Sequence, residues 1–306
     1  MRRPVILISR CIEFDNCRYN GQGVKSPLVK KLKEFCDFTT VCPEVSINLG
    51  IPRNPIRIIK SKAGEILIQP STGDILTDKM ETFSKKFLRE IENIDGIILK
   101  GRSPSCGIKD VKIFSEKGIE LSRKHAGFFG REVVEKYSGY PMEDEGRLMD
   151  ERLREHFLIK LYAFAGFREA RDEKNITGLL KYHEYNKLLF MAYNQKEMRI
   201  IGNLLGNQKK FTKNELFDSY FESLKRITER PITKGNDENT LLHAFGYVSK
   251  NMKKKEIEFF LKTLHNYREG AVSVTVLKSL MKSFIVRFEV AYLEKQTYFN
   301  PYPAGL

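Results

Sequence analysis

Five cysteines are the residues of this 306-residue chain best suited to chemistry. They are Cys11, Cys17, Cys36, Cys42 and Cys106, and none follows in the rest of the sequence. An odd count argues against a disulfide framework and for a reducing compartment, where clustered cysteines are more often metal ligands or nucleophiles. We therefore expect a cytoplasmic protein with free thiols.

Short apolar runs precede three of these cysteines and predict buried strands near residues 5–9, 39–41 and 96–99. Amphipathic helices are predicted after Ser26 and over residues 78–93, between these strands. Alternation of strand and helix predicts an α/β domain with a mostly parallel sheet. Residues 56–59 and 65–68 flank a turn around Ala63, a pattern typical of a hairpin.

Cys11, Cys42 and Cys106 each follow one of the predicted strands. Because the carboxyl ends of parallel strands face one crevice, in which ligands bind, we expect the three thiols to meet there. Cys36 shares an apolar helix face and is expected to be a core thiol. Cys17 follows Cys11 by six residues, and the sequence leaves it as either a fourth ligand or a redox-sensitive bystander.

Three converging thiolates are compatible with more than one kind of site. Zinc takes three protein ligands plus water when it is catalytic, whereas an iron–sulfur cluster with three cysteines leaves one iron open. A lone nucleophilic cysteine needs a nearby base, and the predicted sheet domain offers only His125, outside the three loops. The residue types favour a metal centre and leave its metal undecided.

The residues around the cysteines form three motifs: S-x-C followed by R-Y-N-G, C-P-E-V followed by G-x-P-R-x-P-I-R, and S-P-S-C-G. Together they resemble the thiouracil desulfurase family over roughly residues 4–140. The rest, from Gly146 to Pro303, is similar to the helical domain fused to this module in the tRNA 4-thiouridine desulfidases. The resemblance implies hydrolytic removal of sulfur from a thiolated uracil, without net electron transfer.

The resemblance also implies specific roles. It implies a 4Fe–4S cluster held by Cys11, Cys42 and Cys106, with one open iron that binds the thiocarbonyl sulfur. Glu44 of the C-P-E motif and Ser103 are implied as catalytic residues.

Three further residues near these motifs are expected to bind substrate. They are Ser105, Arg10 and Lys100.

The predicted domains are residues 1–143, the iron–sulfur desulfidase domain, and residues 147–306, an all-α domain. Residues 139–146 between them are polar, acidic and rich in turn formers, and residues 271–276 are ambiguous between strand and helix. The net charge of +14 fits a polyanionic partner or general solubility charge equally well, and the resemblance implies tRNA carrying thiolated uridine as the partner. The candidate RNA-binding residues are His183, Lys187, Lys209, Lys210, Lys253, Lys254, Lys255 and Arg268, interleaved with Tyr182, Tyr185 and Tyr267.

Three alternatives remain at this stage. A free thiobase such as 2-thiouracil needs only the small crevice and no RNA-binding surface. An iron–sulfur sensor would bind nucleic acid without catalysis, and a zinc-dependent hydrolase would use the same thiols. No apolar run approaches the ~18 residues that cross a bilayer, so a membrane enzyme is not expected.

Overall fold

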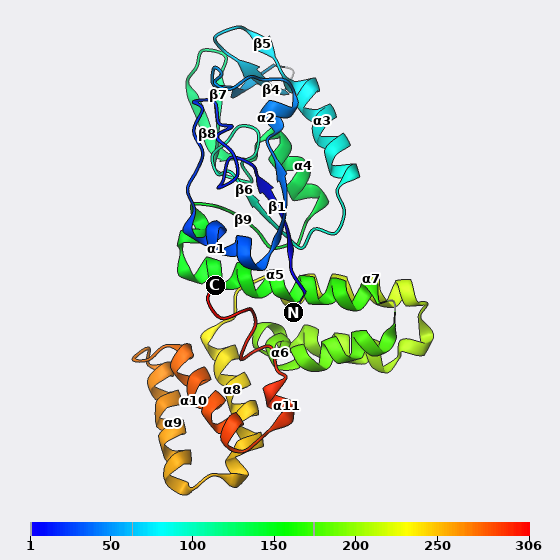
Figure 1. Cartoon of the computed structure of the whole chain (residues 1–306), viewed down its shortest axis with the longest axis vertical. Helices are drawn as coiled ribbons and strands as arrows, with labels where there is room; N and C mark the ends of the chain where they lie inside the picture. Colours follow the sequence, from blue (N-terminus) through cyan, green and yellow to red (C-terminus); the bar gives the residue numbers. More distant parts are fainter. Residues whose placement is uncertain (1, 63, 174) are drawn as a thin grey trace. The chain divides into compact units, whose positions relative to one another are not determined.

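A computed structural model describes residues 2–62, 64–173 and 175–306 (Figure 1). The chain divides into two compact units, one ending at Ala165 and the other comprising Gly166–Gly305. The division falls inside α5 (Glu151–Asp172), of which residues 151–165 belong to the first unit. The first unit is α/β and the second is helical, which confirms the predicted fold class.

A four-stranded parallel sheet lies at the centre of the first unit, with strand order β2-β1-β6-β9. Its strands are β1 (Val5–Ser9), β2 (Asp37–Val41), β6 (Gly96–Leu99) and β9 (Met142–Asp144). The strand β1 pairs with β2 on one side and with β6 on the other, so the three predicted strands are neighbours. All four residues of β6 are buried, which explains its uninterrupted apolar sequence.

A second sheet of the first unit has the order β5-β4-β3-β7-β8 and is mostly antiparallel. Its strands are β3 (Arg57–Ser61), β4 (Gly64–Gln69), β5 (Asp74–Ile75), β7 (Val111–Ser115) and β8 (Glu120–His125). The predicted hairpin is confirmed as β3 and β4, although Ala63 in its turn lies outside the described residues. The strands β7 and β8, which follow the Cys106 loop, were not predicted from the sequence.

Helices cover the sheets of the first unit. They are α1 (Pro27–Phe35), α2 (Pro43–Ser46), α3 (Thr77–Glu90) and α4 (Phe128–Lys136). Side chains of α3 and α4, which lie side by side in Figure 1, share one hydrophobic core with strands of both sheets. Ser26 caps α1 by accepting a hydrogen bond from the Val29 amide, and Pro27 stands at its first position, as predicted.

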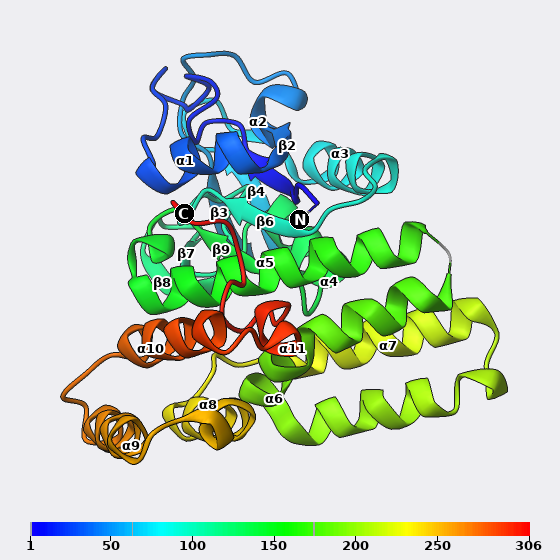
Figure 2. The same ribbon diagram turned by 60° about the horizontal axis from the view of Figure 1, so that its bottom comes forward.

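The second unit is built from helices (Figure 2). They are α6 (Ile176–Gly206), α7 (Lys213–Ile227), α8 (Lys234–Val248), α9 (Lys254–Arg268), α10 (Val274–Arg287) and α11 (Ala291–Glu294). The helix α6 is interrupted at Asn194, where the backbone leaves the helical region. The ambiguous segment 271–276 becomes the start of α10, after Ser273. Among the described residues, no helix is both long and apolar enough to cross a membrane.

Candidate active site

The three predicted thiols meet at the carboxyl ends of three adjacent strands. Cys11 comes two residues after β1, Cys42 directly after β2, and Cys106 in the loop after β6. All three line one cavity of about 320 Å³ in the first unit. The predicted convergence is therefore confirmed, and its cause is that β2, β1 and β6 are consecutive parallel strands.

The C-P-E motif forms the start of α2. Cys42 is the residue before the first helical position, which Pro43 occupies with its preset backbone angle and without an unsatisfied amide. Glu44 lies in the first turn, where the exposed amides of a helix favour a carboxylate. This local geometry places a thiol and a carboxylate two residues apart on the same cavity wall.

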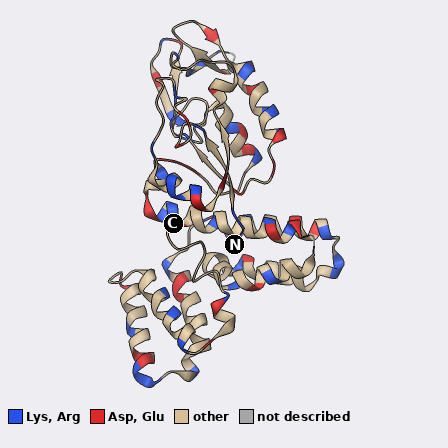
Figure 3. Ribbon diagram, viewed as in Figure 1, with Lys and Arg blue, Asp and Glu red and all other residues tan. Residues whose placement is uncertain are grey.

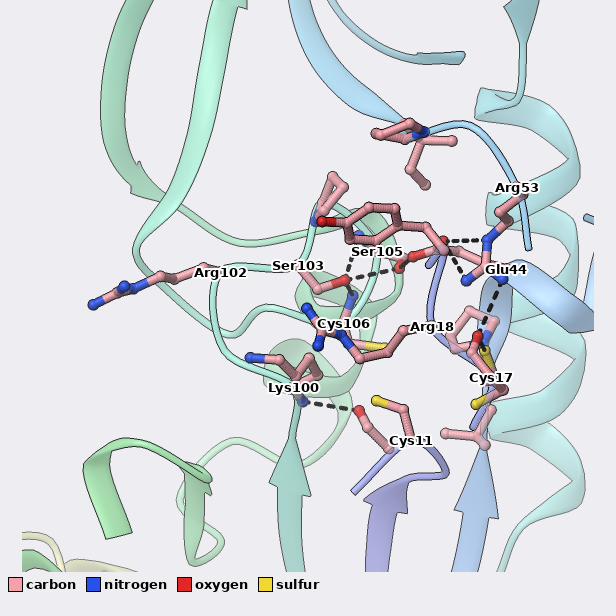
Figure 4. A pocket seen from close by; sticks show the side chains of 18 of the residues that line it. Cys11, Cys17, Arg18, Glu44, Arg53, Lys100, Arg102, Ser103, Ser105 and Cys106 are labelled. Atoms are coloured by element: carbon pink, nitrogen blue, oxygen red, sulfur yellow. Dashed lines mark hydrogen bonds and ion pairs between the residues drawn. The ribbon is translucent and has the colours of Figure 1, made fainter. Parts of the chain in front are cut away.

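Both oxygens of Glu44 have a partner, each from a different segment of the chain (Figure 4). The Ser105 hydroxyl donates a 2.6 Å hydrogen bond to Oε1. Arg53 donates from Nε at 2.8 Å and approaches with Nη2 at 2.7 Å, both to Oε2. The side chains of Arg53 and Glu44 are only 5% and 13% exposed, so this charge-assisted contact is shielded from water.

Arg53 is a site residue to which the sequence analysis assigned no role, although it belongs to the quoted G-x-P-R motif. Besides Glu44, its guanidinium donates 3.1 Å hydrogen bonds to the carbonyl oxygens of Cys17 and Gly50. One side chain thus joins the Glu44 carboxylate to the loop that follows β1.

The S-P-S-C-G loop contains a chain of hydroxyls. The Ser103 hydroxyl lies 3.0 Å from that of Ser105, and it accepts a hydrogen bond from the Cys106 amide at 3.1 Å. Ser105 is fully buried and contacts Glu44 directly. The resemblance implied Ser103 as a catalytic residue, and the structure connects its hydroxyl to the Glu44 carboxylate through Ser105.

The amino-terminal end of α4 holds this loop in place. Amides of Phe128 and Gly130 donate hydrogen bonds to the carbonyls of Pro104 and Ser105 at 3.0 and 2.9 Å. A Cβ atom at Gly130 would lie 2.2 Å from the Gly107 carbonyl oxygen, so only glycine permits this close approach. The close packing of Gly130 against the Gly107 carbonyl therefore positions the loop that carries Cys106.

Cys17 lies among the predicted ligands, with its side chain in contact with the thiols of Cys11 and Cys42. The hydrogen bond to Cys17, together with burial, raises the pKa of the Cys42 thiol well above its usual value. Burial likewise raises the pKa of the Cys106 thiol to about 12. In Figure 4 the sulfur atoms of Cys11, Cys17 and Cys106 point into a common space.

The donor set is chemically suited to an iron–sulfur cluster, in which each cysteine binds a different iron. Cys11, Cys42 and Cys106 stand on three separate loops around one cavity. Among the residues that the structure describes, no group of three His, Cys, Asp or Glu side chains forms a site for a single metal ion.

The predicted substrate-binding residues have different positions. Lys100 lines the cavity, and its ammonium is paired with Glu145, which the sequence analysis did not name. Arg10 is not among the residues that line the cavity, but its side chain contacts both Asp15, with Nε 3.5 Å from Oδ2, and the Cys17 thiol, which does line it. Ser105 lines it, but its hydroxyl is committed to Glu44.

The candidate RNA-binding residues of the second unit do not form one patch. Lys253–Lys255 and Arg268 lie at opposite ends of α9, about 22 Å apart. Lys187, Lys209 and Lys210 are exposed on α6 and just after it. Basic residues are scattered over the helices of this unit rather than grouped on one (Figure 3).

The structure does not support an RNA contact for His183 or base stacking by two of the tyrosines. Nδ1 of His183 lies 3.1 Å from the Tyr220 hydroxyl, and burial lowers the pKa of this histidine to about 4. Tyr182 and Tyr267 are buried in the helical core. An amphipathic helix buries the residues on one of its faces, and Tyr182 and Tyr267 lie on the buried faces of α6 and α9.

Cys36 is the core thiol that the sequence predicted. It is 2% exposed and lies 3.9 Å from the Tyr162 hydroxyl. Burial raises the pKa of the Cys36 thiol to about 12.

The parallel sheet brings free thiols, a paired carboxylate and two hydrogen-bonded serines to one cavity, which is the candidate active site of an α/β domain. A family model described as 2-thiouracil desulfurase matches residues 6–145, and a second, described as a protein of unknown function (DUF1722), matches residues 187–303. YbbK of Bacillus subtilis (strain 168), an uncharacterized protein, is 31% identical over 154 residues, which cover 48% of this chain and 99% of YbbK. The chain belongs to the thiouracil desulfurase family.

Two further similarities cover about half of the chain. YbgA of Escherichia coli (strain K12), also uncharacterized, is 23% identical over 155 residues, or 50% of this chain and 92% of YbgA. A solved structure, the [4Fe-4S]-dependent thiouracil desulfidase TudS, matches with a TM-score of 0.37 and 22% identity, covering 48% of this chain and 94% of TudS. Family membership supports a desulfidase activity that cleaves a carbon–sulfur bond.

Proposed function

We propose that this chain is an iron–sulfur-dependent desulfidase that removes sulfur from 4-thiouridine in tRNA, giving uridine and hydrogen sulfide. The observation that carries the proposal is the meeting of Cys11, Cys42 and Cys106 with the Glu44–Ser105 pair in one cavity. The cavity volume of about 320 Å³ is at the small end for ligand sites, so it suits a single nucleobase.

Cys11, Cys42 and Cys106 are the residues that would hold a 4Fe–4S cluster. When bound there, the cluster supplies a thiophilic Lewis acid for the thiocarbonyl group. The proposed reaction converts a thiocarbonyl and water into a carbonyl and hydrogen sulfide, with no net transfer of electrons.

The protein's own groups manage the protons of this reaction. Glu44 accepts a proton from the attacking water and returns it to the departing sulfur, a role that typically contributes 10²–10⁴-fold in rate. Ser105 holds Oε1 and Arg53 holds Oε2, so the carboxylate keeps one orientation during the transfer. Ser103 extends this row of hydrogen bonds by one more hydroxyl.

The thiols lie on the wall of a cavity that has room for a base but not for a stacked helix. A base within tRNA therefore has to leave its stack to reach them. The basic composition of the chain supports a polyanionic substrate. These arguments favour a nucleotide in RNA over a free base such as 2-thiouracil, which remains the alternative substrate.

Anaerobic reconstitution with iron and sulfide, followed by treatment of thiolated tRNA, tests the proposal. We expect mass spectrometry of the nucleosides to show conversion of 4-thiouridine to uridine, with sulfide released in equal amount. If only free 2-thiouracil is converted, the substrate is the free base and not thiolated tRNA. Binding of tRNA without sulfide release would indicate a sensor, and stoichiometric zinc in place of iron would indicate a hydrolase.

Serine variants of individual cysteines test the proposed ligands through iron content and absorbance, independently of activity. Cys42→Ser should lose bound iron, whereas Cys36→Ser should keep it, because the Cys36 thiol lies outside the cavity beside Tyr162. Cys17→Ser should keep the iron if three ligands suffice. Loss of iron in Cys17→Ser would make Cys17 the fourth ligand and contradict the open iron.

A further inference from the structure

A second cavity of about 550 Å³ lies in the first unit and adjoins the thiol-lined one. Three residues, Ile56, Arg102 and Pro104, line both cavities. Arg102 follows β6 by three residues, and its side chain extends away from Ser103 and Cys106 in Figure 4. A ligand longer than a base can therefore occupy both cavities at once.

The second cavity is strongly basic. Four cationic side chains line it among the described residues, and Asp110 is the acidic one. The cations are Arg57, Arg102, Lys112 and Arg123.

Strand register explains why these cations gather. Arg57, Lys112 and Arg123 stand on β3, β7 and β8, which are consecutive in the second sheet. Ile58 pairs with Ile113, so Arg57 and Lys112, one residue before each, are neighbours across two parallel strands. Arg57, Lys112 and Arg123 are all exposed, and Arg57 and Lys112 each precede a buried isoleucine in their strands.

Two of the four cations that line this cavity share one acidic partner, Glu120, and the other two, Arg57 and Arg102, form no ion pair among the described residues. Glu120 pairs with both Lys112, at 2.9 Å, and Arg123. Arg57 instead lies over the Phe114 ring, 5.0 Å from its centroid, a contact that leaves its N–H donors free for an anion. Phe114 lines the same cavity and adds an aromatic surface.

We propose that this second cavity binds the phosphate of a thiouridine nucleotide whose base occupies the thiol-lined cavity. The inference rests on the proposed function for the identity of the base, and on geometry alone for the phosphate. Guanidinium groups match phosphate oxygens in charge and in fork geometry. The phosphate belongs either to a mononucleotide or to an RNA strand, and the chemistry of recognition is the same.

A pair of matched double variants tests this subsite. Arg57→Gln/Arg123→Gln removes two cavity cations from β3 and β8. Lys60→Gln/Lys124→Gln removes two exposed cations from the same two strands, outside the cavity. Both variants lose the same charge, so only position distinguishes them.

Two readouts are compared between the variants. The first is calorimetric affinity for uridine 5′-monophosphate relative to uridine, which requires no activity. The second is the ratio of kcat/KM for 4-thiouridine 5′-monophosphate to that for 4-thiouridine, with thiolated tRNA as a parallel substrate. We expect the phosphate preference of the wild type to fall about tenfold or more in Arg57→Gln/Arg123→Gln and to persist in Lys60→Gln/Lys124→Gln.

The outcomes separate the two proposals. A tenfold loss for tRNA alone assigns the phosphate to an RNA strand, and a loss for both substrates assigns it to any thiouridine nucleotide. Equal losses in the two variants, or no phosphate preference in the wild type with either substrate, overturn the subsite. If no thiolated compound releases sulfide, the proposed function fails, and the affinity for uridine 5′-monophosphate still decides the subsite.

Discussion

Ser105 donates a 2.6 Å hydrogen bond to Glu44, although the two residues are 61 positions apart in the chain. Ser105 comes from the loop after β6 and Glu44 from the first turn after β2, so the contact spans the β1 strand between them. The same loop carries Cys106, and the same turn begins at Cys42. The hydrogen bond therefore connects the two elements that supply both thiols and the candidate base.

Ser105→Ala removes the donor to Glu44 and should lower kcat about 10–100-fold, the range expected for a lost hydrogen bond to a charged group. Ser103→Ala should have a smaller effect, because Ser103 reaches Glu44 only through Ser105. Steady-state kinetics at matched iron content measure both, with exposed Ser138→Ala as the control. A larger loss in Ser103→Ala than in Ser105→Ala would contradict this order.

Arg53 and Glu44 should act as one unit. Glu44→Gln should keep bound iron and lose turnover, and Arg53→Met should lower kcat by about 100-fold or more, because it leaves a shielded carboxylate without its charge partner. The double variant should be no worse than Glu44→Gln, since Arg53 acts by holding Glu44. A double-mutant cycle in kcat checks this, and fully additive losses, or a fully active Glu44→Gln, would refute the pairing.

Gly130→Ala should disrupt the Cys106 loop. The added methyl would lie 2.2 Å from the Gly107 carbonyl oxygen, so either α4 or the loop must move. We expect a lower melting temperature and reduced iron binding after reconstitution. Gly202→Ala is the control, because nothing lies within 4 Å of its added Cβ and alanine favours the helix. Normal iron binding in Gly130→Ala would show that this packing does not position Cys106.

Acid should destabilise the helical unit through His183. Burial, with Lys187 nearby, lowers the pKa of His183 to about 4 from its usual value near 6.5. Stability from the neutral ring is therefore fully present above pH 6.5 and is lost as the pH falls toward 4, by at most about 1.4 kcal/mol per pH unit.

Thermal unfolding followed between pH 7 and pH 4.5 tests this linkage. His183→Asn, which does not titrate, should show a shallower loss of melting temperature than the wild type. His243→Asn is the control, because His243 is exposed on α8. Identical slopes in all three proteins would exclude His183 as the acid-sensitive group.

The sequence alone was sufficient to predict the parallel sheet and the meeting of three cysteines. Four consecutive buried residues in β6 leave a clear apolar signal, and the carboxyl ends of neighbouring parallel strands share one edge by geometry. The start of α2 at C-P-E was not predicted, although it is a local property, because Pro43 sets its own backbone angle.

Other features depend on side-chain direction, which local sequence does not encode. Arg10 was expected to bind substrate and lies beside the cavity, in contact with Asp15 and Cys17, and His183 was expected to bind RNA but packs against Tyr220. The role of Arg53 became visible only in the structure, in which its guanidinium donates a hydrogen bond to Glu44. Each case is decided by contacts between distant segments.

Sequence periodicity thus determined which strands are buried and where the thiols follow them, because burial acts on every residue of a run. Tertiary structure decided which hydroxyl reaches Glu44 and which cations line the second cavity. Those outcomes depend on the register of β3, β7 and β8 and on the packing of α4 against the Cys106 loop. Register and packing arise from contacts across the whole fold, and a shift of one residue along a strand would turn the same side chains to the opposite face.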